Sequence, residues 1–334
     1  MITTRGLART FTSRSRSGRT TVEAVRGVDI EVAEGELIGF LGPNGAGKTT
    51  TLRMLTTLLT PTAGEATVAG CDLRTDPLGV RKRIGYVSQS GGATAEAKVG
   101  EELVLQGQFY RMPAARARDR AAELIEQLDL RGLDDRRCRT LSGGQRRRLD
   151  IAMGLIHEPR LVFLDEPSTG LDPQSRANLW DHIRKLRNEQ GATVFLTTHY
   201  LDEADALSDR IIVIDNGAIV AEGTQDELKS RVAGDAVRFT VDTEHAARAA
   251  TIAERLNGAR ELSTADGEVF LRVPRGDTAM PELLRALDAE HITMTAMSVQ
   301  RPTLDDVFLT FTGRSLREAE APDTETTKEH ADVA

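Results

Sequence analysis

Short apolar runs, separated by helix-like stretches, recur through the first two thirds of the chain. Four of them end at a glycine or at a residue with a functional side chain: "LIGFL" before Gly42, "IGYVS" before Gln89, "LVFL" before Asp165 and "TVFLTT" before His199. Such runs, bounded by turn residues, are typical of parallel strands buried on both faces. Because ligands of open α/β sheets gather at the carboxyl ends of the strands, the pattern predicts one site shared by these four ends.

The pattern changes after Lys229. It predicts strands at residues 236–241, 259–263, 268–273 and 292–299, with helices at 244–256 and 278–289. This order suits a small α+β unit of the ferredoxin-like type. The sequence of this unit contains no catalytic cluster.

Two shorter patterns flank this second unit. Asn216 and Gly217 separate "IIVID" from "AIVAEG" and predict a hairpin just before the boundary. In "TLDDVFLTF" the apolar residues share one helical face, which is more typical of packed core than of a binding surface. These residues are Leu304, Val307, Phe308 and Phe311. From Arg314 the tail is acidic and poor in large apolar residues, so we expect it to be disordered.

Composition narrows the class of protein. The chain of 334 residues is long enough for two or three domains, and 40% hydrophobic with 28% charged residues is an ordinary globular balance. A net charge of −8 gives no general attraction to nucleic acid or anionic lipid. Cys71 and Cys138 lie far apart and suggest neither a disulfide framework nor a zinc site. No run approaches the roughly 18 apolar residues that span a bilayer, so a membrane role requires a partner.

The stretch "GPNGAGKTT" matches a phosphate-binding loop between a strand and a helix. Its glycines let backbone N–H groups curve around phosphates, Lys48 reaches the β and γ oxygens, and the Thr49 hydroxyl is a ligand for Mg²⁺. The candidate ATP-binding residues of this loop are Gly42, Pro43, Asn44, Gly45, Ala46, Gly47, Lys48, Thr49 and Thr50.

Two adjacent carboxylates, Asp165 and Glu166, follow the run "LVFL". Like charges at a strand end repel each other, so stability alone does not favour the pair, although a solvated turn is the alternative. Asp165 is predicted to hold Mg²⁺ through water, and Glu166 to activate the attacking water. Gln89 offers an amide to Mg²⁺ and to this water, and His199 a hydrogen bond to the γ-phosphate. Taken alone, either of these two residues would more simply be structural.

The stretch "LSGGQRRRLD" begins a further predicted helix. Ser142 and Gln145 have the spacing of a capping box, and the N–H groups of the first turn form an anion site. Gly143 and Gly144 would let the backbone approach an anion closely. The same capping box can, however, simply begin a helix. The arginines at 146–148 are most simply a solvated helix face, with phosphate or partner contact as the alternative.

Taken in order, "GPNGAGKTT", "YVSQS", "LSGGQ", "LVFLDEP", "STGLD" and "TTHY" resemble the ATP-binding-cassette ATPases over residues 1 to about 230. The resemblance implies an α/β P-loop cassette with a parallel-sheet core, a helical subdomain at about 90–157 and an antiparallel β part. A C-terminal accessory domain at 231–313 and a tail at 314–334 would follow. By resemblance, "LSGGQ" is the family signature, Gln89 the lid glutamine and His199 the switch histidine. Phe11 in "LARTF" resembles the aromatic residue that stacks on adenine.

The resemblance also implies partners. Cassettes of this family pair head to tail, so the signature residues Ser142, Gly143, Gly144 and Gln145 are expected at an ATP held by a second copy of the chain. A separate transmembrane permease would hold the protein at the cytoplasmic side of the cell membrane. It would dock on the loop after Gln89 and on the helical stretch to about His157. No nucleic-acid partner is expected.

A finer resemblance concerns "RRRLDIA" and "RPTLDDVFLTFTG", which look like the daunorubicin-resistance group of drug-export cassettes. In that group the C-terminal element is regulatory or supports dimers. We therefore expect an ATPase, using ATP and Mg²⁺, that powers efflux of a drug or hydrophobic secondary metabolite. The alternative is a soluble cassette ATPase acting on nucleic acid or ribosomes. A nucleotide-gated module without catalysis is a third interpretation, and intact Glu166 and His199 count against it.

Overall fold

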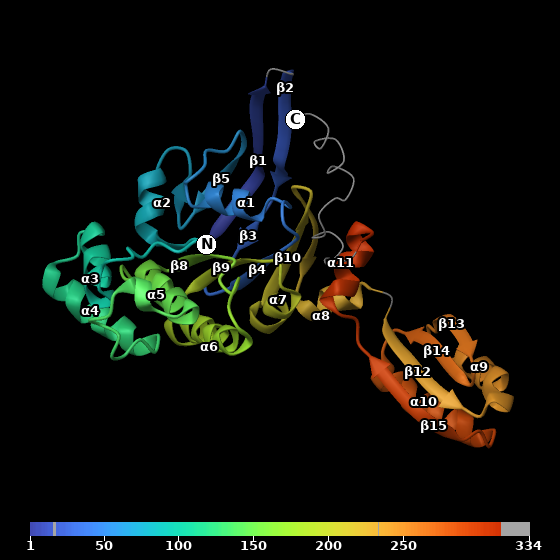
Figure 1. Cartoon of the computed structure of the whole chain (residues 1–334). Helices are drawn as coiled ribbons and strands as arrows, with labels where there is room; N and C mark the ends of the chain where they lie inside the picture. The colour runs from blue at the N-terminus through green and yellow to red at the C-terminus, as the bar shows by residue number, and fades with distance from the viewer. Residues whose placement is uncertain (16–17, 233, 315–334) are drawn as a thin grey trace, which may run out of the picture. The chain divides into compact units, whose positions relative to one another are not determined.

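The four predicted strands lie side by side in a six-stranded sheet (Figure 1). The computed structural model describes residues 1–15, 18–232 and 234–314. The sheet contains β4 (Leu37–Leu41), β7 (Ile84–Val87), β8 (Leu161–Asp165), β9 (Thr193–Thr198), β10 (Arg210–Asp215) and β11 (Ala218–Gly223). Its order is β11-β10-β4-β9-β8-β7, and the last five of these strands pair in parallel. The prediction of parallel strands is confirmed.

Side chains of this sheet alternate between two hydrophobic cores on its opposite faces. In β9, Val194 and Leu196 belong to one core, while Phe195 belongs to the other. Phe163 of β8 joins Phe195, with ring centroids 5.6 Å apart. Because both faces are covered, every position of the strand is apolar or small, which explains the continuous runs in the sequence.

Helices and a second sheet provide this cover. The first core receives side chains from α3 (Val99–Phe109), α4 (Ala114–Gln127), α5 (Gly143–Leu155), α6 (Pro173–Gln190) and α7 (Leu201–Leu207). The second core receives them from α1 (Lys48–Leu55) and α2 (Pro77–Arg83). In Figure 1, α3, α4 and α5 lie together at one side of the sheet.

An antiparallel sheet completes the second core. It contains β1 (Ile2–Ser15), β2 (Gly18–Val28), β3 (Glu31–Val32), β5 (Ala63–Val68) and β6 (Cys71–Asp72). The order is β2-β1-β5-β6, with β3 paired to β1. Ile2, Leu7 and Val68 are fully buried in the shared core. The mixed α/β architecture with parallel and antiparallel parts is as predicted.

A second compact unit begins at Gly223. Its sheet has the order β13-β14-β12-β15, and one core joins it to α9 and α10. The order and connections are those of a ferredoxin-like unit. Its elements are α8 (Gln225–Ser230), β12 (Asp235–Val241), α9 (Ala246–Glu254), β13 (Arg260–Ala265), β14 (Glu268–Val273), α10 (Gly276–Ala289), β15 (Met294–Gln300) and α11 (Leu304–Thr312).

The shorter predictions have clear outcomes. Asn216 and Gly217 both have positive φ, 48° and 78°, and join β10 to β11, so the hairpin is confirmed. On α11, Leu304, Val307 and Phe308 are buried as predicted for core, whereas Phe311 is 36% exposed. Short 3-10 turns occupy Cys138–Thr140 and Thr243–His245. The predicted disorder after Arg314 lies outside the described residues.

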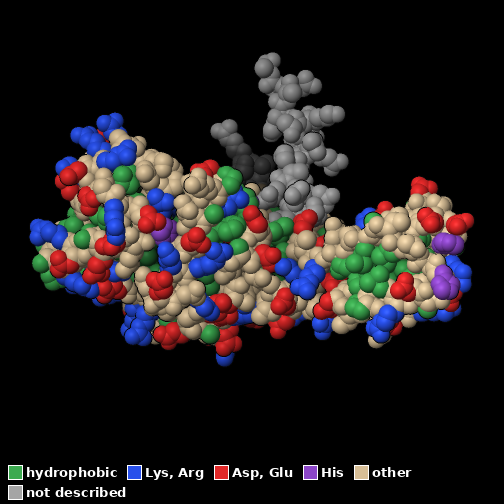
Figure 2. All heavy atoms as spheres, turned by 90° about the horizontal axis from the view of Figure 1, so that it is seen from below, with side chains coloured by type: hydrophobic (Ala, Val, Ile, Leu, Met, Phe, Trp, Pro, Cys, Tyr) green, Lys and Arg blue, Asp and Glu red, His purple; other side chains and the backbone are tan. Residues whose placement is uncertain are grey.

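The surface carries charges of both signs (Figure 2), and the two cysteines are buried. Figure 2 shows acidic and basic side chains interspersed over the visible face, without a continuous basic field. Cys71 and Cys138 are both buried free thiols. Within the described ranges, no helix combines the length and the apolar character needed to cross a bilayer.

Candidate nucleotide-binding site

The phosphate loop connects β4 to α1. Gly47 caps the helix at φ 106°, and a Cβ there would lie 2.6 Å from the carbonyl oxygen of Ala24, so only glycine fits. The first backbone bond of the helix runs from the Thr51 N–H to Gly47, so the N–H groups before Thr51 have no acceptor within the helix. No side chain caps this end. The N-terminus of α1 is therefore built to receive an anion.

Lys48 lies inside this loop and is only 4% exposed. Its ammonium donates to the carbonyl oxygens of Gly42 at 2.7 Å and Pro43 at 3.0 Å. Nζ is also 3.2 Å from Oε1 of Glu166. The lysine side chain thus folds back over the phosphate loop. Its positive charge lies at the carboxyl end of the sheet.

Three predicted site residues converge on the carboxylate of Glu166. Besides Lys48, Nε2 of Gln89 donates to Oε2 at 3.0 Å, and Nδ1 of His199 lies 3.2 Å from the same oxygen. Burial raises the pKa of this carboxylate, but His199 and Lys48 act in the opposite direction and together lower the pKa of Glu166 to about 2. The ends of β4, β7, β8 and β9 therefore do meet at one point.

The backbone of Glu166 is strained. Its φ is 43°, a left-handed conformation that costs a residue with a Cβ on the order of 1 kcal/mol. The N–H of Glu166 donates to the Thr197 carbonyl and lies 3.1 Å from both this oxygen and the Thr197 hydroxyl. These contacts hold the sharp turn after β8 that presents the carboxylate to Lys48.

Asp165 lies beside the loop with two hydroxyl partners. Its Oδ1 accepts from Thr49 at 3.2 Å and from Thr197 at 2.7 Å. The Thr49 hydroxyl donates here, so its lone pairs stay available to a cation. A carboxylate, a hydroxyl and the Gln89 amide oxygen are all hard ligands of the kind that Mg²⁺ binds together with phosphates. These residue types therefore fit the ion.

A pocket of about 180 Å³ opens at this point. It is lined by Ala24, Asn44, Gly45, Gly47, Lys48, Thr49, Thr50, Gln89 and Glu166. The signature residues, from Ser142 to Gln145, are not among these lining residues, and neither is Phe11. One chain thus brings together the phosphate loop and the strand ends, but not the signature.

The signature forms the predicted capping box at the start of α5. The Ser142 hydroxyl accepts from the Gln145 N–H at 3.3 Å, and the Ser142 N–H donates to the Gln145 side chain at 3.0 Å. The two glycines differ. A Cβ on Gly144 would lie 2.8 Å from Oγ of Ser175, whereas a Cβ on Gly143 would meet Leu171 at an ordinary 3.8 Å. Gly144 is required by packing inside the chain, and Gly143 leaves its outer side open.

Phe11 lies on β1 opposite Val22 of β2 and is 39% exposed. The guanidinium of Arg9 lies 4.7 Å from the centre of its ring. The guanidinium therefore covers one of the two faces of the Phe11 ring. The stacking of Phe11 on adenine stays a prediction.

The expectation of a solvated arginine face is wrong for Arg147. This residue is 6% exposed and donates to three backbone carbonyls inside the protein. Sequence spacing could not reveal it, because its partners lie at the ends of β7 and β8 and in the loops that follow them, and are not neighbours of Arg147 along the chain. Thr197, which holds Asp165 and Glu166, was missed for the same reason, although it stands two residues before the predicted His199.

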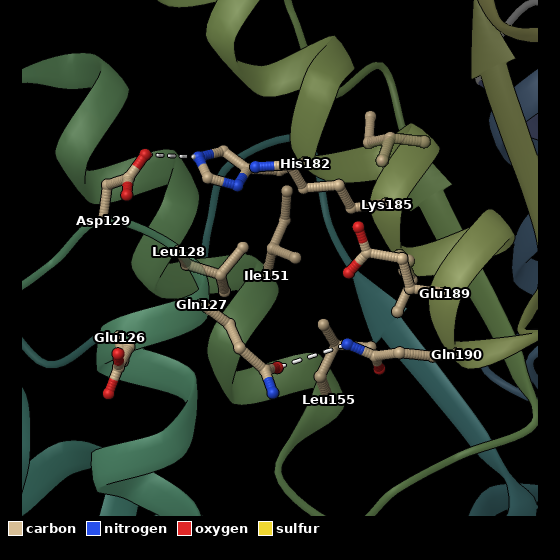
Figure 3. A pocket seen from close by; sticks show the side chains of 12 residues that line it. Glu126, Gln127, Leu128, Asp129, Ile151, Leu155, His182, Lys185, Glu189 and Gln190 are labelled. Carbon is tan, nitrogen blue, oxygen red and sulfur yellow. Dashed lines mark hydrogen bonds and ion pairs between the residues drawn. The ribbon is translucent and has the colours of Figure 1, made fainter.

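Another pocket, of about 440 Å³, lies where α4, α5 and α6 meet (Figure 3). His182 is buried there, with Nε2 3.3 Å from Asp129, and burial lowers its pKa below the usual value. The amide of Gln190 donates to Gln127 at 3.2 Å across the opening. None of the predicted ATP-site residues lines this pocket.

The phosphate loop before α1 and the carboxylates at the end of β8 define a P-loop nucleoside triphosphatase. Residues 25–169 match the family model described as "ABC transporter", and residues 223–312 match "ATP-binding protein DrrA1-3-like, C-terminal domain". The chain belongs to the ABC transporter family of ATP-binding proteins, in the DrrA-like daunorubicin-resistance group.

Comparisons with individual proteins support the same family assignment. The chain is 44% identical over 301 residues to the daunorubicin resistance ATP-binding protein DrrA3 of Streptomyces coeruleorubidus, covering 90% of this chain and 94% of the relative. It is 45% identical to the daunorubicin/doxorubicin resistance ATP-binding protein DrrA of Streptomyces peucetius, covering 87% and 88%. The dimeric ATP-binding cassette MJ0796 bound to ADP and Pi superimposes with a TM-score of 0.61 at 26% identity, covering 67% of this chain and 98% of that one.

The protein is thus an ATP-binding, ATP-hydrolysing subunit of an ABC exporter. Cassettes of this family form dimers, and the ATP-binding subunits of exporters pair with membrane permeases. These findings do not favour the alternative of a soluble cassette ATPase acting on nucleic acid or ribosomes.

Proposed function

We propose that this chain powers the efflux of a drug or hydrophobic secondary metabolite through a separate permease, with Glu166 as the base that activates water. The observation that carries the proposal is the convergence of Lys48, Gln89 and His199 on the Glu166 carboxylate within 3.0 to 3.2 Å. The names of the relatives, which are daunorubicin and doxorubicin resistance proteins, support the cargo class.

The ion pair between Lys48 and Glu166 has a chemical consequence. A carboxylate whose pKa is near 2 is a weak base. When phosphate oxygens bind the Lys48 ammonium, Glu166 shares one of the two neighbours that lower its pKa, the other being His199, and its pKa rises. The carboxylate then takes a proton from the attacking water more readily. The oxygen of that water bonds to the γ-phosphorus, the bond from the γ-phosphorus to the bridging oxygen breaks, and ADP leaves with the bridging oxygen. Lys48 therefore couples arrival of the triphosphate to the strength of the base.

Mg²⁺ would be held by Thr49 and Gln89 directly and by Asp165 through water, and would neutralise charge on the phosphates. Within the described part of the chain, no group of three or more His, Cys, Asp and Glu side chains is arranged to hold a metal. A Mg²⁺ ion shared with phosphates does not require one, because one or two protein carboxylates suffice.

Two chains would pair head to tail, so that Ser142 of one chain meets the ATP held by Lys48 of the other. The signature residues do not line the pocket of their own chain, which supports this arrangement. Oγ of Ser142 accepts from the Gln145 N–H, so its own proton is available for a phosphate oxygen. The open side of Gly143 leaves room for that approach.

The permease would dock on the loop after Gln89 and on the helical stretch to about His157. At the end of that stretch lies a groove of about 880 Å³, which contains residues from α2, α3 and the segment that follows α5, but none from the loop after Gln89. The permease would also contact this groove. Three large apolar side chains in it are exposed: Leu58 by 58%, Leu78 by 58% and Phe109 by 73%. Exposed apolar side chains next to one another are typical of a contact surface. Such docking places the protein at the cytoplasmic side of the membrane.

We propose the domain boundaries 1–230 for the cassette and 231–313 for the C-terminal accessory domain. The core of the second unit contains only its own residues, which supports an independently folded domain. Its role would be regulatory or would support the dimer. Phe11 is proposed to stack on adenine with the ring face that Arg9 leaves uncovered.

The direct test is Glu166→Gln in the purified full chain. We expect ATP binding to persist and hydrolysis to fall roughly 10²- to 10⁴-fold, because the amide cannot accept a proton from water. ATP titration and phosphate release measure the two properties. The matched control is Lys48→Ala, which should instead weaken ATP binding itself. Near-normal turnover by Glu166→Gln would reject the role of this carboxylate.

A further inference from the structure

Arg147, which lies outside the predicted site, uses all three of its guanidinium nitrogens as donors inside the protein. Its Nε donates to the carbonyl of Pro167 at 2.9 Å, Nη1 to that of Ser88 at 2.6 Å and Nη2 to that of Asp165 at 2.9 Å. Each guanidinium nitrogen thus serves a different carbonyl. A planar fork with five donors suits this task, and an ammonium does not.

These three carbonyls adjoin the chemistry. Ser88 precedes Gln89, and Asp165 and Pro167 are the residues on either side of Glu166. Glu166 has a left-handed backbone, which persists only where its neighbours are held in place. Arg147 holds both of those neighbours, so it sets where the Glu166 carboxylate and the Gln89 amide point.

One turn further along α5, Asp150 binds the other end of the Gln89 loop. Its Oδ1 accepts from the N–H of Gly92 at 3.0 Å and of Ala93 at 3.4 Å, and the side chain is 7% exposed. Gly91, at φ 74°, approaches so closely that a Cβ would lie 2.6 Å from Asp150. Arg147 and Asp150 lie three residues apart and so share one face of the helix. The loop is therefore attached to α5 on both sides of Gln89.

We infer that Arg147, with Asp150, is a positioning residue that links the signature helix to Gln89 and Glu166 and thereby couples the two ATP sites of the dimer. The inference rests on the proposed head-to-tail arrangement. In it, Ser142 at the start of α5 senses the ATP of the partner chain, whereas Gln89 and Glu166 act on the ATP of their own chain. A shift of α5 on closure at one site moves the catalytic loops of the other.

The test uses Arg147→Gln in the full chain, with Arg148→Gln as the matched control. Arg148 lies on the same helix but donates to the Asp129 carbonyl at 3.4 Å, away from the catalytic loops. For Arg147→Gln we expect kcat per ATP-binding site to fall on the order of 10- to 100-fold, while KM changes less than about twofold. The Hill coefficient for ATP should fall from above 1 in the native chain towards 1. Arg148→Gln should keep the native kcat and the native Hill coefficient.

A merely structural role would give a different result. It would lower the melting temperature and the fraction of sites that bind ATP, but leave kcat per binding site and the Hill coefficient unchanged. Arg147→Lys, which keeps the charge without the fork, should recover part of kcat. If Arg147→Gln does not fold, Asp150→Ala releases only the loop after Gln89 and should lower kcat and the Hill coefficient in the same direction.

Three outcomes overturn the inference: equal losses in Arg147→Gln and Arg148→Gln, an unchanged kcat per binding site and Hill coefficient in Arg147→Gln, or a native Hill coefficient of 1. The failure of the proposed function can be recognised separately. If Glu166→Gln also keeps normal turnover, the catalytic assignment fails. If Glu166→Gln is inactive while Arg147→Gln is normal, only the coupling role fails.

Discussion

The imidazole of His157 is held in its neutral form. It stacks on Tyr110 with ring centroids 3.6 Å apart and an interplanar angle of 3°. Its Nε2 lies 2.9 Å from the Ile84 carbonyl, which can only accept, so this nitrogen carries the proton. Burial lowers the pKa of His157 to about 4, although the bond to Ile84 acts in the opposite direction. Both residues of the stack line the groove proposed for the permease.

This pKa predicts a loss of stability in acid. The folded pKa is lower than the value near 6.5 of the unfolded chain, so the unfolded state binds more protons as pH falls from 6.5 towards 4. Between pH 7.5 and 5.0 the native chain should lose ~2 kcal/mol more than His157→Phe, which stacks but cannot titrate. Urea unfolding of the cassette at both pH values measures this. An equal pH dependence in the two proteins would refute the neutral histidine.

At the level of elements, α5 has two functions at its N-terminus. The capping box satisfies the first turn within the chain, and the same turn is proposed to face the partner's phosphate. The two glycines divide these functions. A Cβ at Gly144 would lie too close to Ser175 of α6, whereas a Cβ at Gly143 would meet Leu171 at ordinary van der Waals distance.

Matched substitutions separate the two functions. Gly144→Ala should lower the melting temperature of the chain without nucleotide, because its Cβ would lie 2.8 Å from Oγ of Ser175. In a Ser175→Gly background, which has its own cost in α6 because the bond from Ser175 to Asp172 is lost, Gly144→Ala should lower the melting temperature much less. Gly143→Ala should leave that melting temperature nearly unchanged but weaken the ATP-dependent dimer, measured by sedimentation of chains that carry Glu166→Gln. The reverse pattern would show that Gly143, not Gly144, serves internal packing.

At the scale of the whole molecule, each ATP site is proposed to need two chains. One chain brings Lys48, Gln89, Glu166 and His199 together, but its own signature lies outside the pocket. A site completed only by a partner makes nucleotide trapping depend on assembly. Complementation between two defective chains can therefore reveal the arrangement.

The two defective versions are Lys48→Ala and Ser142→Arg, and neither homodimer should trap ATP. In a mixed dimer both defects fall in one composite site, and the other combines an intact Lys48 with an intact Ser142. Trapping should therefore recover at one site per mixed dimer, measured as nucleotide retained after tandem purification of differently tagged chains. If Ser142 served its own chain, no complete site would exist and retention would match the parents.

Local stretches of the sequence were enough to predict the phosphate loop, the capping box at Ser142 and the hairpin at Asn216. Each depends on residues that are neighbours along the chain, because a positive φ or a cap is decided within a few residues. The parallel strands were predicted for a related reason: burial on both faces removes alternation from the sequence itself. The position of a site at the strand ends followed from the topology that these strands imply.

The roles of Arg147, Thr197 and Glu203 could be seen only in the folded chain. Arg147 stands among three consecutive arginines, yet the carbonyls that it binds belong to Asp165 at the end of β8 and to Ser88 and Pro167 in the loops that follow β7 and β8. Glu203 reads as one more acid of α7, but it is fully buried and hydrogen-bonded to Ser168 and Trp180, and burial raises its pKa. Whether a charged side chain is solvated or buried depends on which distant segments pack over it, and no periodicity of its own helix carries that information.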